Sequence, residues 1–161
     1  MSEQTTAAAP VDRTDANLTA AHAEVKAEIS RTDNKASLLL AFIGALLAGV
    51  WSVATSLRLP VAALVSGGVG AALLVAAAAV LLGTVRPNLG GTRPVGFPRW
   101  AGLTSEQIRA ELGQDRRPEH IAVLSRIAVA KFGRLRRAVD LTLMAGALFI
   151  VAAGIAVGGA L

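Results

Sequence analysis

Three uninterrupted apolar runs divide the chain. The first extends from Leu38 to Leu57 without a charged residue, and the other two cover residues 61–85 and 141–161. Each has roughly the twenty apolar residues that an α-helix needs to cross the hydrocarbon core of a bilayer. The pattern therefore predicts an all-α membrane protein with three transmembrane helices, at about residues 38–57, 61–85 and 141–161.

Polar segments with helical periodicity lead into the first and third runs. Before the first run, apolar and small residues recur at spacings of three and four, which predicts a helix that begins at Thr14 or Asp15 and continues into the membrane. Before the third run, a second stripe follows Pro118 and also continues without a break. We expect these helical extensions of the two spans to pack against each other outside the membrane. The stripe residues are Leu18, Ala21, Val25, Ile29, Thr32 and Ala36, and then Ile121, Leu124, Ala128 and Leu135.

The remaining segments are polar or rich in glycine and proline. Residues 1–13 have nothing to bury, so we interpret them as a disordered tail before a single domain, residues 14–161. Residues 86–140 form a long polar segment whose first part, RPNLGGTRPVGFPRW, predicts a loop. Trp100 in this part either docks at the membrane interface or belongs to a small apolar core.

A short helix is predicted within the long polar segment. Thr104 is placed to cap it and Gln107 stands at the third helical position, which together match a capping box. Gly113 is the expected stop.

Composition supports burial in lipid and suggests an orientation. The chain has 161 residues, is 53% apolar and has a mean hydropathy of +0.56. It carries 16 Lys and Arg against 11 Asp and Glu, and eleven of the basic residues lie in residues 86–140, whereas the hairpin tip has Arg58 alone. Because basic residues accumulate on the cytoplasmic side, we expect a cytoplasmic N-terminus and a cytoplasmic segment 86–140.

Motifs for catalysis are not found in the sequence. The chain has no cysteine, and His22 and His120 lack a metal-binding spacing. We find no nucleophile with a base, no phosphate-binding P-loop and no dinucleotide fingerprint. We therefore predict a protein that is not an enzyme, has no cofactor and has no nucleic-acid partner.

One lysine interrupts the second apolar stripe. Lys131 lies seven residues after Leu124 and four before Leu135, in the middle of that stripe. Three interpretations are open. The ammonium group pairs with a carboxylate of the first helix, or it reaches a bound anion, or its stem packs while its head reaches water.

A basic cluster is expected where the two helical extensions meet the membrane. Its members suit a phosphate group, because their hydrogen bonds to phosphate are charge-assisted. They suit anionic lipid headgroups equally, since each basic residue near the membrane surface adds about 1 kcal/mol of attraction. On the charge pattern alone, we favour binding to lipid headgroups over binding to a phosphate ligand. The alternative function is thus a non-enzymatic membrane scaffold whose basic cytoplasmic patch binds anionic lipid or a partner protein. The cluster consists of Arg31, Lys35, Lys131, Arg134, Arg136 and Arg137.

Three segments carry a family resemblance: RTDNKASLLLAFIGALLAG, FPRWAGLTSEQIRAEL and LSRIAVAKFGRLRRAVDL. The most specific parts are the R-x-D-x-K-A-S pattern before the first span and the pattern S-R-I-x-x-x-K-F-x-x-L-R-x-A before the third. From about Leu18 to the third span, the chain resembles the transmembrane effectors of Pycsar, a bacterial antiphage system based on pyrimidine cyclic nucleotides. The matching residues are Arg31, Asp33, Lys35, Ala36, Ser37, Ser125, Arg126, Ile127, Lys131, Phe132, Leu135, Arg136 and Ala138.

The resemblance implies a function. In that family a partner pyrimidine nucleotide cyclase makes cyclic UMP or cyclic CMP on infection, and the effector then impairs the inner membrane and kills the host cell. On this basis we expect a homo-oligomeric, multi-pass protein of the bacterial inner membrane that contacts membrane lipid. Arg134 and Arg136 are expected to contact the phosphate, and Asp33 either belongs to the site or orients a basic side chain. The expected ligand-binding residues are Arg31, Asp33, Lys35, Lys131, Arg134 and Arg136.

Overall fold

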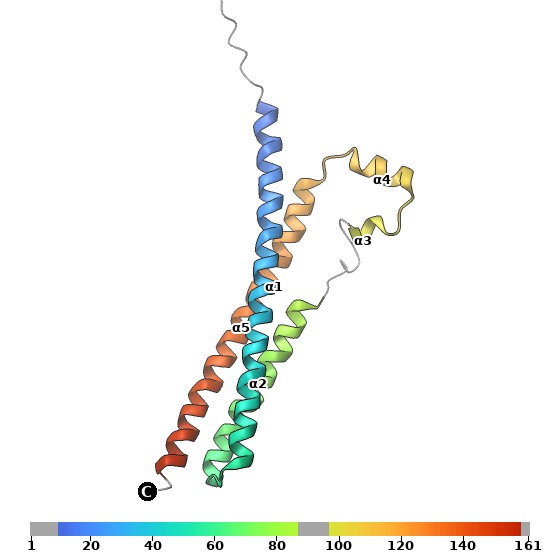
Figure 1. The fold of residues 1–161 in the computed structure, drawn as a ribbon. Coiled ribbons are helices and arrows are strands. Elements are labelled where there is room, and N and C mark those ends of the chain that lie inside the picture. Colours follow the sequence, from blue (N-terminus) through green and yellow to red (C-terminus); the bar gives the residue numbers. More distant parts are fainter. Residues whose placement is uncertain (1–9, 87–96, 159–161) are drawn as a thin grey trace, which may run out of the picture. The chain divides into compact units, whose positions relative to one another are not determined.

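All regular structure in the described part of the chain is helical. The computed structural model describes residues 10–86 and 97–158. Three helices in these ranges are long and apolar enough to cross a membrane, which confirms the all-α prediction with three spans. Figure 1 labels the helices α1 (Pro10–Ser56), α2 (Val61–Val85), α3 (Phe97–Trp100), α4 (Ser105–Leu112) and α5 (Arg117–Gly158).

Several boundaries differ from those predicted. Helix α1 begins at Pro10 instead of Thr14 or Asp15, since a proline in the first turn has no N–H that the helix would need. Residues 1–9 lie outside the described residues, so the disordered tail stays a prediction there. Phe97–Trp100 form a helical turn within the segment predicted to be a loop, and a proline at its second residue is compatible with a first turn. The preceding residues 87–96 lie outside the described residues.

The chain divides into two compact units. We call Met1–Ser30 with Asn88–Ala128 the head unit, and Arg31–Pro87 with Val129–Leu161 the membrane unit. Helices α1 and α5 each contribute to both units, as expected of spans with helical extensions. The single domain at residues 14–161 stays a prediction.

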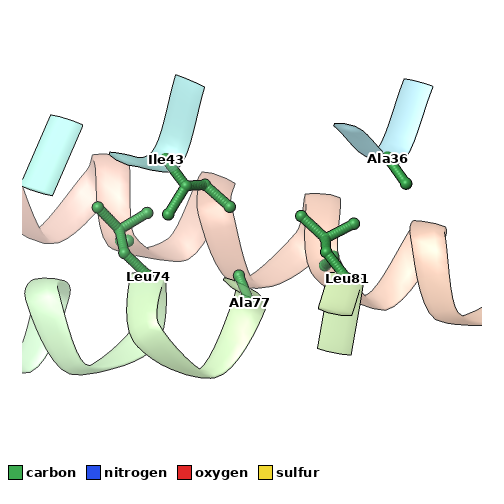
Figure 2. Packing of buried hydrophobic residues seen from close by; sticks show 7 residues of the cluster. Ala36, Ile43, Leu74, Ala77 and Leu81 are labelled. Carbon is green, nitrogen blue, oxygen red and sulfur yellow. The ribbon is translucent and has the colours of Figure 1, made fainter. Parts of the chain in front are cut away.

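The membrane unit is built around a small core that its three helices share. Ile43 of α1 and Leu74 and Leu81 of α2 are fully or almost fully buried, and Figure 2 shows these side chains between the two helices. The other core positions are alanines, which allow helix backbones to approach closely. They are Ala36, Ala77, Ala138 and Ala145.

The outer surface of the membrane unit is apolar. Trp51, Val61 and Ile150 are each more than 70% exposed, and many other large apolar side chains are also exposed. A soluble protein rarely exposes so much contiguous apolar surface, whereas a bilayer is a suitable solvent for it. The surface is therefore that of a membrane protein.

The head unit contains the predicted short helix, α4. Thr104 Oγ1 accepts a hydrogen bond from Gln107 N at 3.3 Å, and Gln107 Oε1 accepts one from Thr104 N at 2.9 Å. Gly113 is the C-cap. The capping box and the glycine stop are thus confirmed.

Candidate functional site

Lys131 is paired with Asp33 at the polar end of the membrane unit. The Nζ atom of Lys131 lies 2.5 Å from Oδ1 and 2.7 Å from Oδ2 of Asp33. The Lys131 side chain is only 13% exposed and that of Asp33 is 35% exposed. Of the three interpretations of Lys131, the structure shows pairing with a carboxylate of the first helix. Because the Lys131 side chain is largely shielded from water, the attraction is screened less than that of a fully exposed pair.

The pair lies next to the apolar core along both helices. Ala36 follows Asp33 by about one helical turn, and Ala138 follows Lys131 by about two turns. Both alanines are fully buried. The ion pair therefore joins α1 to α5 where the polar parts of these helices give way to the membrane core.

Arg134 makes a second contact at this end of the unit. Its Nη1 atom donates a hydrogen bond to the carbonyl oxygen of Gly83 at 3.0 Å. Gly83 lies in the last turn of α2, where carbonyl groups lack partners within the helix and the helix dipole favours a cation. Arg134 thus connects α5 to α2, while Lys131 connects α5 to α1.

The remaining three predicted site residues are exposed. Arg31 and Lys35 are each two positions from Asp33 along the chain, so they lie about 200° around α1 from it. Arg136 is five residues beyond Lys131 and lies about 140° around α5. The structure therefore does not gather all six predicted residues at one point. Three of them join helices, and three lie on outward faces.

An ionic network in the head unit was missed by sequence reasoning. Arg117, at the start of α5, contacts Asp15 of α1 and donates to Thr19 Oγ1 at 2.7 Å. Its Nε atom also lies 2.8 Å from the carboxylate of Asp115. The hydrogen bonds that Arg117 donates, first to Asp115 and then to Asp15, raise the pKa of Arg117, and the bond that Asp115 accepts from Arg117 lowers the pKa of Asp115. In the sequence, the signal for this network was the presence of acidic and basic residues near the two predicted helix starts. Which of them pair depends on how α1 is aligned against α5, and the sequence does not give that alignment.

Two histidines lie side by side in the head unit. The ring centroids of His22 and His120 are 6.3 Å apart, with the rings tilted by 44°. Burial lowers the pKa of His22, and Lys26, His120 and Arg117 lower it further by charge repulsion. Among the described residues no group of three or more potential metal ligands is found. From the sequence we considered these histidines only as metal ligands, so we did not predict that they contact each other.

Comparison with known proteins gives a family match. A protein-family model described as the Pycsar effector protein domain matches residues 17–158. No curated protein and no solved structure matches the chain.

Proposed function

This chain belongs to the Pycsar effector family, and on that premise we propose that it acts in the bacterial inner membrane as an effector activated by cyclic UMP or cyclic CMP. Family membership makes it an effector of antiphage cyclic-nucleotide signalling, of a non-catalytic type. A partner pyrimidine nucleotide cyclase supplies the ligand, and the activated effector impairs the membrane and kills the infected cell.

The observation that best supports a mechanism is the Asp33–Lys131 pair. A carboxylate holds this lysine in the structure, and a phosphate group is an anion that can compete for it. We propose that the ligand phosphate draws Lys131 away from Asp33, which changes how α5 packs on α1. Arg134 is the second group to respond, because it can exchange the Gly83 carbonyl for the phosphate.

The energy required for such a switch is within reach of a nucleotide. Moving an equilibrium from 1:99 to 99:1 requires about 5.5 kcal/mol of differential binding. Hydrogen bonds to charged groups contribute about 1.5–3 kcal/mol each. Two to four contacts that exist only in the activated state are therefore sufficient, about as many as the basic cluster can offer.

The three exposed cations can act together between copies of the chain. Arg31, Lys35 and Arg136 lie on faces turned away from the ion pair. In a homo-oligomer such faces of neighbouring copies meet, so a phosphate between copies can be contacted by these residues. We therefore propose a homo-oligomer in which all six predicted residues take part in the response, with the N-terminus in the cytoplasm.

Calorimetric titration of the detergent-solubilised protein tests this function. Cyclic UMP, cyclic CMP and cyclic AMP are each titrated into the wild type, and we expect saturable binding of cyclic UMP or cyclic CMP. Lys131→Met should abolish binding without changing the oligomer size. The matched control is Arg126→Gln, which removes an exposed cation of the same helix whose Nε donates to its own helix at Ala122 O.

The scaffold alternative predicts a different outcome. No response to any of the three nucleotides, together with retained binding to anionic liposomes, would favour a scaffold that uses its basic patch for lipid headgroups. Binding that is equal in Lys131→Met and wild type would remove Lys131 from the proposed site.

A further inference from the structure

The membrane unit has an apolar groove at the end where α1 and α2 join. Its volume is about 910 Å³, within the range of small-molecule sites. Helices α1, α2 and α5 all contribute to its walls, and every lining residue is apolar or glycine. Apolar cavities hold water poorly and take apolar ligands instead. A groove of this composition in a membrane-spanning unit is therefore suited to a hydrocarbon chain.

Small residues keep this groove open. Gly49 of α1 and Gly68 of α2 line it, and nothing lies within 4 Å of the position that a Cβ atom would take at either residue. Helices α2 and α5 nevertheless approach each other closely beside it, since a Cβ atom at Gly67 would lie 3.9 Å from Cβ of Ala152. The unfilled volume is therefore a consequence of the small side chains, and a larger side chain at Gly68 would occupy it.

An unpaired cation stands at the hairpin-tip end of the groove. Arg58 is exposed and lies between Leu57 and Leu59, which both line the groove. Within residues 10–86 and 97–158, Arg58 makes no hydrogen bond and no ion pair. A guanidinium binds a phosphate group through charge-assisted hydrogen bonds that are often bidentate. An apolar groove that ends at such a group matches a phospholipid, in which acyl chains are joined to a phosphate.

The charge pattern distinguishes a lipid from a second copy of the chain as the occupant. Residues 38–85 and 141–161 contain no aspartate or glutamate, and Arg58 is their only charged residue. The spans of a neighbouring copy therefore offer no side-chain carboxylate to Arg58, and a copy in the same orientation brings a second arginine to the same depth. An anionic phospholipid instead brings a phosphate to that depth, together with a chain for the groove.

We infer that this groove binds an anionic phospholipid, with an acyl chain along its apolar walls and the phosphate on Arg58. Trp51 also lines the groove, and indole side chains favour the depth at which lipid headgroups lie. The site is separate from the Asp33–Lys131 pair, because Asp33 and Ala54 lie about 32 Å apart along α1 at a rise of about 1.5 Å per residue. The inference therefore does not depend on the proposed response to a cyclic nucleotide.

Quenching of Trp51 by brominated lipids tests this site. The full-length protein is reconstituted in phosphatidylcholine vesicles that contain increasing amounts of phosphatidylglycerol or phosphatidylcholine with brominated acyl chains. The chain has two tryptophans, so Trp51→Phe gives the emission of Trp100, which is subtracted. We expect phosphatidylglycerol to bind about fivefold more tightly than phosphatidylcholine, the ratio that corresponds to about 1 kcal/mol for one basic residue. Arg58→Gln should make the two lipids bind equally.

Variants that fill the groove separate it from the general attraction of lipid to the protein surface. Gly68→Leu, and Ala153→Leu on the α5 wall, should each remove the preference for phosphatidylglycerol. The matched control is Gly44→Leu, which should keep the preference, because Gly44 also has nothing within 4 Å of an added Cβ but does not line the groove. Equal binding of the two lipids by the wild type, or a preference that survives both filling variants, overturns the inference. A change of oligomer size in Gly68→Leu but not in Gly44→Leu, measured by light scattering in detergent, also overturns it and identifies a second copy as the occupant.

Discussion

Lys131 shows how a single residue can connect the polar and apolar parts of the molecule. Placing an ammonium group in an apolar stripe costs solvation free energy, and a carboxylate at hydrogen-bond distance offsets that cost. The net contribution of such a pair to stability is often small, but removing one partner leaves the other charge poorly solvated. A pair of this kind is therefore suited to hold one arrangement and to release it when a competing anion arrives.

A double-mutant cycle on this pair gives the first prediction. Lys131→Met and Asp33→Ala should each lower the free energy of unfolding by about 1–3 kcal/mol, because each leaves a partly buried charged group without its partner. The double variant should be less destabilised than the sum of the two single variants. Unfolding of the solubilised protein in one detergent measures all four forms. Strict additivity would show that the two side chains do not interact.

Gly70 gives the second prediction at this scale. A Cβ atom added there would lie 2.9 Å from Cε1 of Phe149, so the Phe149 ring or the two helices would have to shift. Gly70→Ala should lower the free energy of unfolding by about 1–3 kcal/mol, and Phe149→Leu should restore part of it by making room. Gly68→Ala is the matched control, since nothing lies within 4 Å of its added Cβ. Thermal stability is measured for the wild type and the three variants, and equal loss at Gly68 and Gly70 would refute a specific contact.

Some of these contacts were predictable from the sequence and others were not. The position of Lys131 in a stripe identified it as unusual, but the choice among its three partners required the register of α1 against α5. Asp33 lies 98 residues before Lys131, and Thr19 lies 98 residues before Arg117. This separation between the paired residues of α1 and α5 could not be predicted from the sequence. The hydrogen bond from Arg134 to Gly83 was also not predictable, because its acceptor is a backbone carbonyl, which every residue has.

At the scale of elements, the contact of α1 with α5 in the head unit includes titratable groups. The pKa of His22 is lowered from its ordinary value of 6.5, first by burial and then by Lys26, His120 and Arg117. The unfolded chain therefore binds a proton at a higher pH than the folded chain does. In the window between the lowered pKa and 6.5 the unfolded state holds more protons, so stability falls as pH falls through that window.

This gives the third prediction. The thermal midpoint of the wild type should decrease on acidification below about pH 6.5, and His22→Gln should show a shallower decrease. The control is Glu24→Gln, which changes an exposed residue on the same helix. Identical pH profiles for wild type and His22→Gln would exclude His22 as a source of the dependence.

The elements themselves were largely predictable. Length and hydropathy identified the three spans, and the pattern at Thr104 and Gln107 located α4 with its cap and stop. Helix boundaries were less accurate, as Pro10 and Phe97–Trp100 show. Proline occurs in both cases, and proline is compatible with a loop and with the first turn of a helix. Composition alone cannot separate those two possibilities.

At the scale of the whole molecule, the orientation in the membrane gives the fourth prediction. The chain has no native cysteine, so single cysteines can report on each side. A membrane-impermeant maleimide should label Ser56→Cys, next to the hairpin tip, in intact cells. It should label Ser105→Cys only after the membrane is opened, because residues 86–140 are rich in basic residues and are proposed to be cytoplasmic. The reverse labelling pattern would place the basic cluster away from a cytoplasmic ligand.

Dissipation of a membrane potential is the most direct test of the central claim, that a cyclic nucleotide makes this protein impair the bilayer. Purified protein is reconstituted in liposomes that hold a potassium diffusion potential, and a voltage-sensitive dye reports the potential as nucleotide is added. We predict that cyclic UMP or cyclic CMP discharges the potential in protein-containing liposomes and leaves protein-free liposomes unchanged. A potential that survives saturating amounts of both nucleotides would contradict the account.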